Sequence, residues 1–524
     1  MHNSFSLHKE LVGFLIKIRL KITIPPLASM KRFDICIIGG GPAGYAAAMR
    51  ALDFNKKVVL IEKNKLGGAG VYNGALSSKT FWELAKDVSS VRKRMLKFET
   101  GQTFDVTFKQ ILDDVGEGIS IRKEQLERQV FLLQEKKAPN FEYINGFASF
   151  LSHTEIEIDS IHGKEIITAD NFIIATGSRP RKLAHLPIDE EIIVTSDGVE
   201  SFKEFPKSMV ILGAGVIGCE WATIFSNFGY TKVSIIDKAD RILPFEDYDV
   251  TENISKNMLK DGVTIHNGAQ LSSMKIVNGE VEYELDYNDG RKETHRVEKA
   301  LISIGRVPNI ENIGLEKAGV IVENGHIANI DGQTNIPNIY AIGDITADIA
   351  LVSVAEVEGR HVIEKIINKK TDPLIINNLS TIMFLNPEVA SVGLNEMQAQ
   401  KKGLRYRVVS MTYDLIPRAI AMRNNNGFFK ILVTDDDKMK ILGMRAVGVH
   451  ASSAIQAVAL LMSMDKGIEE LAELIHPHPS IIEGIQECVR MLLKKSILKP
   501  ELFKGKLNCK VCDEFGCTQD IYFV

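Results

Sequence analysis

Cysteine is scarce in this chain, which has only six among its 524 residues. A secreted scaffold stapled by disulfides needs a far higher share, so the composition favours a reducing compartment, and we expect a cytoplasmic protein. Cys36, Cys219 and Cys488 stand singly in apolar or helical stretches. We expect each of these three to be buried and unreactive.

A basic excess is missing as well. The 63 Lys and Arg residues are balanced by 67 Asp and Glu residues, giving a net charge of −4. Proteins that bind nucleic acid normally carry a basic surplus, so that class of partner is excluded. With 45% hydrophobic and 25% charged residues, the chain has the composition of two to four folded domains rather than of long disorder.

No apolar run is long enough for a stable membrane span. The first 29 residues come nearest, but Lys17, Arg19 and Lys21 interrupt their apolar stretch. Met30 stands directly before a strand-like segment, so we interpret residues 1–29 as an N-terminal extension that follows from a mis-assigned start or is disordered. A basic segment on a membrane surface and an organelle-targeting peptide remain the alternatives.

Two glycine-rich fingerprints, each after an apolar strand and before a helix, dominate the rest of the sequence. The first follows residues 33–38 and is completed by a strand that ends at Glu62, and the second follows residues 208–212 and is completed by a strand that ends at Asp237. Their glycines are Gly39, Gly41 and Gly44, then Gly213, Gly215 and Gly218. Two copies, each with an acid at the expected place, predict two dinucleotide sites.

The chemistry of these sites follows from the residue types. Glycines let the backbone approach a pyrophosphate, and the helix N-terminus supplies N–H groups and a positive dipole end. The acids would bind ribose hydroxyls. Asp237 would repel a 2′-phosphate and so favours NAD over NADP, although Lys238 beside it leaves NADP open.

This arrangement resembles the FAD-dependent pyridine nucleotide–disulfide oxidoreductases of the dihydrolipoamide dehydrogenase type. Three further segments resemble the family in its order: NFIIATG at 171–177, ALISIGRVPN at 300–309 and YAIGD at 340–344. The resemblance implies that FAD and NAD are bound and that the aspartate of the last segment holds the flavin's ribityl or pyrophosphate side. The implied cofactor-binding residues of these segments are Ala175, Thr176, Gly177, Gly305, Arg306, Gly343 and Asp344.

The resemblance also implies an α/β fold with two Rossmann-like domains, for FAD and NAD, and a C-terminal α+β dimerisation domain. We expect the FAD domain at 30–180, the NAD domain at 181–300 and a return to the FAD or central domain at 301–375. The interface domain would follow at 376–500 and a cysteine-containing tail at 501–524.

The redox disulfide of the family is absent from this sequence. The stretch LGGAGVYNGALSSK at 66–79 resembles the family's LGGTCLNVGCIPSK, with Gly70 and Ala75 at the cysteine positions. Lys79 and Glu220 are retained, and in the family the matching pair lies beside the flavin's reactive edge. We expect a cleft enlarged by Gly70, Ala75 and Ser77, which suits reduction of a quinone.

The segment HPHPSIIE at 476–483 resembles the family's HAHPTLSE. It implies that His478 is an acid/base, that Glu483 orients it, and that the pair reaches the flavin site of the other subunit of a homodimer. With no thiol to serve, the pair either protonates a different acceptor or persists as a packed element of the interface.

The last segment holds Cys509, Cys512 and Cys517. Three interpretations are open: a redox-active disulfide, a metal site, or a flexible tail with incidental thiols. A zinc site would lack an obvious fourth ligand, and we expect no metal.

Together these features predict an FAD-dependent NAD(P)H oxidoreductase that passes electrons to a small non-disulfide acceptor such as a quinone. Lys79, Glu220, His478 and Glu483 would be the catalytic residues. The alternatives are a soluble pyridine nucleotide transhydrogenase, a dihydrolipoamide dehydrogenase, and a non-catalytic protein that binds flavin and NAD. Dihydrolipoamide oxidation is chemically disfavoured, because no mixed disulfide can form at residues 70 and 75.

Overall fold

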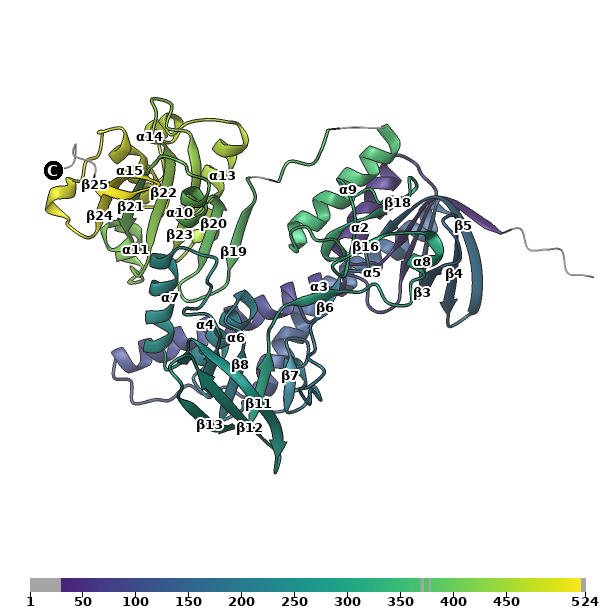
Figure 1. The fold of residues 1–524 in the computed structure, drawn as a ribbon, viewed down its shortest axis with the longest axis horizontal. Helices are drawn as coiled ribbons and strands as arrows, with labels where there is room; N and C mark the ends of the chain where they lie inside the picture. The colour runs from purple at the N-terminus through teal and green to yellow at the C-terminus, as the bar shows by residue number, and fades with distance from the viewer. Residues whose placement is uncertain (1–29, 369–371, 377, 520–524) are drawn as a thin grey trace, which may run out of the picture.

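The computed structural model describes residues 30–368, 372–376 and 378–519. The expectation for residues 1–29 therefore lies outside the described residues. Three lobes can be distinguished (Figure 1), and the first is built from two stretches of the chain, one before and one after the second lobe. Within the described residues, no helix is long and apolar enough to cross a membrane.

The first lobe is a six-stranded sheet of order β1-β2-β3-β4-β5-β18, in which β1 also pairs with β5. The central strands are almost wholly apolar because a parallel strand with helices over it is buried on both faces. Helix α2 starts with Pro42 at its first turn, where a missing N–H costs nothing. Its elements are β1 (Lys31–Ile38), α2 (Pro42–Asp53), β2 (Val58–Glu62), α3 (Gly68–Val71), β3 (Phe141–Phe150), β4 (Glu155–Ser160), β5 (Gly163–Ile174), β18 (Ile339–Ala341) and α9 (Val352–Asn368). Two long helices, α4 (Ala75–Lys97) and α5 (Phe108–Lys137), reach from this lobe to the second, where Phe81 and Phe108 pack in its core.

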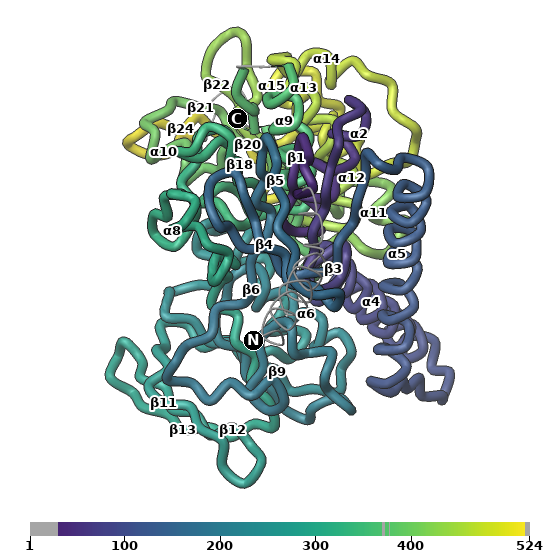
Figure 2. The backbone as a smooth tube through the Cα atoms, turned by 90° about the vertical axis from the view of Figure 1, so that its right-hand side faces the viewer, coloured from purple at the N-terminus to yellow at the C-terminus, as the bar shows by residue number. Residues whose placement is uncertain are grey.

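The second lobe is a five-stranded parallel sheet of order β10-β9-β8-β14-β7, with the antiparallel sheet β11-β12-β13 packed beside it. Figure 2 shows the antiparallel sheet at one end of the molecule and α4 and α5 along one flank. Its elements are β7 (Ile193–Thr195), β8 (Ser208–Leu212), α6 (Val216–Phe228), β9 (Lys232–Ile236), α7 (Tyr248–Lys260), β10 (Thr264–His266), β11 (Ala269–Val277), β12 (Glu280–Tyr287), β13 (Lys292–Val297) and β14 (Lys299–Ile302).

The two lobes are joined by two crossing strands. Strand β6 (Ser178–Pro180) leaves the first lobe, β15 (Arg306–Pro308) returns to it, and the two pair antiparallel. Short elements then lead to β18: α8 (Leu315–Ala318), β16 (Val322–Glu323) and β17 (His326–Ile327).

The third lobe is a seven-stranded sheet of order β19-β20-β23-β22-β21-β24-β25 covered by short helices. The segment set apart in the sequence as a tail supplies its last two strands, because β24 pairs antiparallel with β21. Its elements are β19 (Ser380–Met383), β20 (Val389–Gly393), α10 (Glu396–Lys401), β21 (Tyr406–Thr412), α11 (Pro417–Ala421), β22 (Phe428–Thr434), β23 (Ile441–Val447), α12 (Ala451–Ala454), α13 (Gln456–Ser463), α14 (Glu469–Glu473), α15 (Glu483–Leu492), β24 (Leu507–Asp513) and β25 (Gly516–Gln519).

Candidate active site

The two glycine loops have the same geometry. A Cβ on Gly44 would lie 1.9 Å from the Gly39 carbonyl oxygen, and a Cβ on Gly218 would lie 1.9 Å from the Gly213 oxygen. Only glycine allows helix and strand to pack that closely. A Cβ on Gly41 or Gly215 would meet no atom within 4 Å, so the middle of each loop is open to a ligand.

The two acids hold these loops in the same way. Glu62 accepts hydrogen bonds from the backbone N–H groups of Gly40 at 2.7 Å and Asn64 at 2.8 Å. Asp237 accepts from Ala214 at 2.7 Å and Ala239 at 2.9 Å. Each acid therefore sits against its own loop at the carboxyl end of a parallel strand, where nucleotide sites form.

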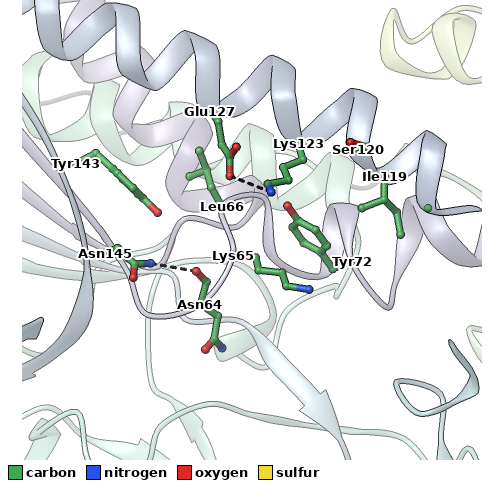
Figure 3. A pocket seen from close by; sticks show the side chains of 11 residues that line it. Asn64, Lys65, Leu66, Tyr72, Ile119, Ser120, Lys123, Glu127, Tyr143 and Asn145 are labelled. Atoms are coloured by element: carbon green, nitrogen blue, oxygen red, sulfur yellow. Dashed lines mark hydrogen bonds and ion pairs between the residues drawn. The ribbon is translucent and has the colours of Figure 1, made fainter. Parts of the chain in front are cut away.

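A cavity of about 490 Å³ opens directly beyond Glu62 (Figure 3). Tyr72 and Tyr143 line it, and the amide of Asn145 at its rim donates to the Asn64 carbonyl at 3.1 Å. The Tyr72 hydroxyl is buried there without a hydrogen-bond partner among the described residues. A buried polar atom without a partner costs free energy, which a polar ligand in the cavity would recover. The remaining lining residues are Lys65, Leu66, Gly116, Ile119, Ser120, Lys123 and Glu127.

Lys79 and Glu220 come together although 141 residues separate them. The Lys79 Nζ lies 3.0 Å from Glu220 Oε2, with the glutamate side chain only 8% exposed. Lys79 also lies over the ring of Phe384 at 4.9 Å, and the Phe384 N–H donates to Glu220 Oε1 at 3.0 Å. Helices α4 and α6 thus hold the Lys79–Glu220 pair, and the Phe384 backbone N–H anchors the second oxygen of the glutamate.

The segment 175–177 is tied to strand β1 and to the return crossing. The Ala175 N–H donates to Ile38 O at 2.8 Å. The Thr176 hydroxyl donates to the carbonyl of Asn309 at 2.7 Å, whose own N–H donates to Gly177 O at 2.9 Å. Gly305 and Arg306 lie on this same crossing, with Gly305 O accepting from Arg181 N–H at 3.0 Å.

Asp344 is linked to both lobes. The Ser178 hydroxyl donates to Asp344 Oδ2 at 2.7 Å. The same hydroxyl oxygen, Oγ, accepts from Arg306 Nε at 2.8 Å. Next to it the N–H of Gly343 donates to Glu358 Oε2 at 2.7 Å. Burial raises the pKa of Glu358 to about 7, against the lowering effect of that N–H. Sequence reasoning missed both partners: Ser178 lies 166 residues from Asp344, and Glu358 stands in a recognisable segment, LVSVAEVEG at 351–359, to which no role was given.

The space at Gly70 is filled. A Cβ on Gly70 would lie 2.6 Å from Cγ of Pro42, so the proline ring takes the place of a side chain there. Ser77 is buried, at 2% exposure. At residue 70 the expected enlargement is therefore wrong, because the loss of the cysteine removes sulfur without opening space, while the enlargement at Ala75 stays a prediction.

His478 and Glu483 form an ion pair, with Nδ1 and Oε1 2.8 Å apart and the histidine 68% exposed. Burial by itself would raise the pKa of Glu483, but the Ser480 N–H and His478 outweigh it, so that the pKa is lowered. The glutamate is held as a carboxylate that fixes the imidazole. Both residues lie in the third lobe, at the start of α15.

The cysteines are either buried or joined in a disulfide. Cys36, Cys219 and Cys488 are buried and free, which confirms that part of the expectation, and burial raises the pKa of all three thiols. Cys512 and Cys517 form a disulfide across the β24–β25 hairpin. Cys509 is buried in the core of the third lobe, so the segment is not a flexible tail.

Two Rossmann units with paired loops and acids, joined by a lysine–glutamate pair, define a flavin- and pyridine-nucleotide-dependent oxidoreductase. Residues 33–359 match the pyridine nucleotide–disulphide oxidoreductase family, and residues 379–489 match the dimerisation domain of the same family. The chain belongs to this family, whose cofactors are FAD and NAD(H).

Similar proteins agree in length and fold. The chain is 32% identical over 478 residues to a dihydrolipoyl dehydrogenase of Bacillus subtilis, covering 87% of this chain and 97% of that protein. It is 33% identical to the enzyme of the same name from Chlamydia muridarum, covering 89% and 98%. The structure of LpdA from Mycobacterium tuberculosis superposes with a TM-score of 0.79 at 26% identity, covering 88% and 99%. The flavoprotein disulfide reductase RclA from Escherichia coli superposes with a TM-score of 0.78 at 25% identity, covering 88% and 100%.

Proposed function

We propose that the chain is a homodimeric NADH oxidoreductase that uses FAD to pass electrons to a small acceptor other than a disulfide, such as a quinone. One observation carries this proposal. The Lys79–Glu220 pair is formed at 3.0 Å, while residues 70 and 75 carry no sulfur. The half of the site that meets the nicotinamide is kept, and the dithiol acceptor is missing.

The cofactors fit the residues present. The open centres of both glycine loops would take the two pyrophosphates, and the cavity beyond Glu62 would take the adenosine end of FAD. When bound, FAD accepts a hydride from NADH and releases the electrons to a second acceptor. Asp237, with a negative charge where a 2′-phosphate would lie, favours NADH over NADPH.

The protein's own groups supply charge and a proton. The Lys79 ammonium stabilises negative charge that develops beside it, and Glu220 with the Phe384 N–H keeps that ammonium in place. We infer that His478, held by Glu483, gives a proton to the acceptor from the other subunit. Such a positioned acid contributes ~10²–10⁴-fold.

Dihydrolipoamide oxidation is the activity that the names of the relatives suggest. In that reaction a thiolate of the substrate attacks a disulfide of the enzyme, so the enzyme needs a disulfide beside the flavin. Outside the disulfide, the described cysteines are buried, and three have raised thiol pKa values. Cys512 and Cys517 lie at the outer edge of the third lobe's sheet, in a different lobe from residues 70 and 75.

Anaerobic rapid mixing of the FAD-loaded protein with NADH tests the proposal. We expect the flavin absorbance to bleach, to recover on addition of a benzoquinone, and not to recover with lipoamide. A flavin that stays oxidised would show a binding protein instead. Recovery with lipoamide at the rate seen with quinone would show a disulfide reductase, and recovery with a nicotinamide analogue alone would show a transhydrogenase.

A further inference from the structure

Two histidines and a glutamate gather where the two sheets of the second lobe meet. His266 is the last residue of β10, while Glu293 and His295 lie two residues apart on β13. One ligand atom from each of the three side chains lies within 4.8 Å of the others. Nothing in the flavin chemistry above uses these residues.

Glu293 and His295 lie on the inner face of β13 and remain accessible to solvent. Along β13 they alternate with the exposed Lys292, Thr294 and Arg296. Across the sheet they face Leu285 and Tyr283 of β12, both 1% exposed or less. Their own side chains are 32% and 34% exposed, so a cation from solvent could reach them.

The hydrogen bonds converge on one oxygen. Glu293 Oε2 accepts from the Tyr287 hydroxyl at 3.0 Å and from His295 Nε2 at 2.9 Å. The Tyr287 oxygen lies 2.6 Å from His266 Nδ1. Because the single hydroxyl proton goes to Glu293, His266 must donate from Nδ1, which leaves the lone pair on its Nε2. The other glutamate oxygen, Oε1, pairs with Arg291 at 3.0 Å.

Tyr287 lies between the two parts of the cluster. Its hydroxyl contacts both His266 and Glu293. It can therefore orient both side chains from outside the ligand set.

We propose that His266, Glu293 and His295 form a binding site for one Zn²⁺-class divalent cation in the NAD-binding lobe. Two imidazoles and one carboxylate are a known zinc set, and imidazoles argue against Mg²⁺ or Ca²⁺. Ligand atoms around a tetrahedral zinc stand roughly 3.4 Å apart, given bonds of about 2.1 Å. Side-chain rotation would bring the three ligand atoms to that spacing and would replace the His295–Glu293 hydrogen bond by bonds to the metal, with Tyr287 and Arg291 holding the outer atoms.

The position gives such a cation a structural role. His266 ends the edge strand of the parallel sheet, and Glu293 and His295 lie on β13, the edge strand of the antiparallel sheet. The backbone N–H of Asp237 donates to His266 O at 3.0 Å. A cation held here would link the two sheets next to Asp237, the acid proposed to bind ribose.

Zinc titration of the chelator-washed, FAD-loaded full chain without reductant tests the site. We expect one equivalent of Zn²⁺ to bind and to raise the thermal unfolding midpoint, and Mg²⁺ to do neither. His266→Gln and His295→Gln should each weaken binding by at least ~10²-fold, and His185→Gln, an exposed histidine of the same lobe, should leave it unchanged. Failure to bind Zn²⁺, or binding that neither His266→Gln nor His295→Gln weakens, overturns the proposal.

Co²⁺ gives a second readout. It separates this site, which has no sulfur ligand, from the cluster of Glu396 with Cys512 and Cys517. We expect visible bands of tetrahedral cobalt without a thiolate charge-transfer band, unchanged in the Cys512→Ser/Cys517→Ser variant. A thiolate band that disappears in that variant would place the metal in the hairpin and overturn the assignment. Neither titration depends on NADH turnover, so its result is independent of the proposed function.

Discussion

At the scale of single residues, the proposed chemistry depends most on the Lys79 ammonium. Its partner Glu220 is almost fully buried, and a buried acid is tolerated only while it is paired. The pair therefore serves both stability and electrostatics. A variant has to separate the two roles.

Lys79→Met should slow the bleaching of flavin by NADH by ~10²-fold, because the positive charge is lost beside developing negative charge. Glu220→Gln should slow it less, since the lysine keeps its charge and loses only its anchor. Stopped-flow absorbance at saturating NADH measures both. Lys86→Met is the matched control, because Lys86 lies on the same helix in an exposed pair with Glu83. Equal rates in Lys79→Met and in the control would contradict the assigned role.

Glu358 makes stability depend on pH. Its pKa rises from 4.5 to about 7 on folding, so the folded state prefers the protonated acid. The contribution is therefore fully present below pH 4.5 and is lost as pH rises through 7. Glu358→Gln should remove about 1–3 kcal/mol of this pH dependence.

Unfolding midpoints of the FAD-loaded protein at pH 5 and pH 8 measure this effect. Glu356→Gln, an exposed position on the same helix, should keep the dependence of the unchanged chain. A Glu358→Gln protein whose midpoint still falls between these pH values as the unchanged chain's does would show that another group is responsible.

At the scale of elements, β24 and β25 belong to the third lobe's sheet, although their cysteines suggested a separate tail. Leu507 and Cys509 are buried in the third lobe's core, and β24 pairs with β21 along six residue pairs from Tyr406 to Met411. The segment 507–519 is a structural hairpin. Its disulfide links the two strands of that hairpin to each other.

Truncation after Gly505 should lower the unfolding midpoint strongly, because it uncovers the edge of β21 and the core beneath it. Cys512→Ser/Cys517→Ser should lower the midpoint only modestly and leave NADH-to-quinone turnover unchanged. Differential scanning calorimetry and a steady-state assay separate the two results. Loss of turnover in the double serine variant, with its fold intact, would make the hairpin disulfide part of the electron path.

At the scale of the whole molecule, a buried charge network joins the second and third lobes. Lys430, only 2% exposed on β22, contacts Asp247 at 2.7 Å, Asp249 at 2.6 Å and Glu396 at 2.8 Å. Arg445 pairs with Glu246 at 2.7 Å beside it. Burial would lower the pKa of Lys430, but the three carboxylates outweigh it and raise it, so the lysine stays charged.

Lys430→Met should destabilise the protein by ~3–5 kcal/mol, since three acids lose their shared cation. Lys440→Met, which breaks the exposed pair with Asp465, should cost at most ~1 kcal/mol. Thermal unfolding of both variants at one protein concentration compares them. Equal midpoints would mean that the lobes are held together without this network.

Much of the site could be predicted because its parts are local patterns. The glycine loops and the acids at the ends of β2 and β9 follow from strand, turn and helix signals within about 30 residues. Lys79, Glu220, His478 and Glu483 required the family resemblance. The alternation of Leu507, Cys509 and Val511 with polar residues, followed by a turn before Gly516, is a hairpin signal in the sequence.

The sequence by itself determined the two nucleotide folds and the absence of sulfur at residues 70 and 75, because both are properties of contiguous segments. Only the tertiary structure decided that Pro42 fills the space at Gly70, that Ser178 and Arg306 secure Asp344, and that His266 meets Glu293 and His295. Those contacts join residues 27 to 166 positions apart. Packing of whole elements sets such distances, and no local preference of the chain encodes them.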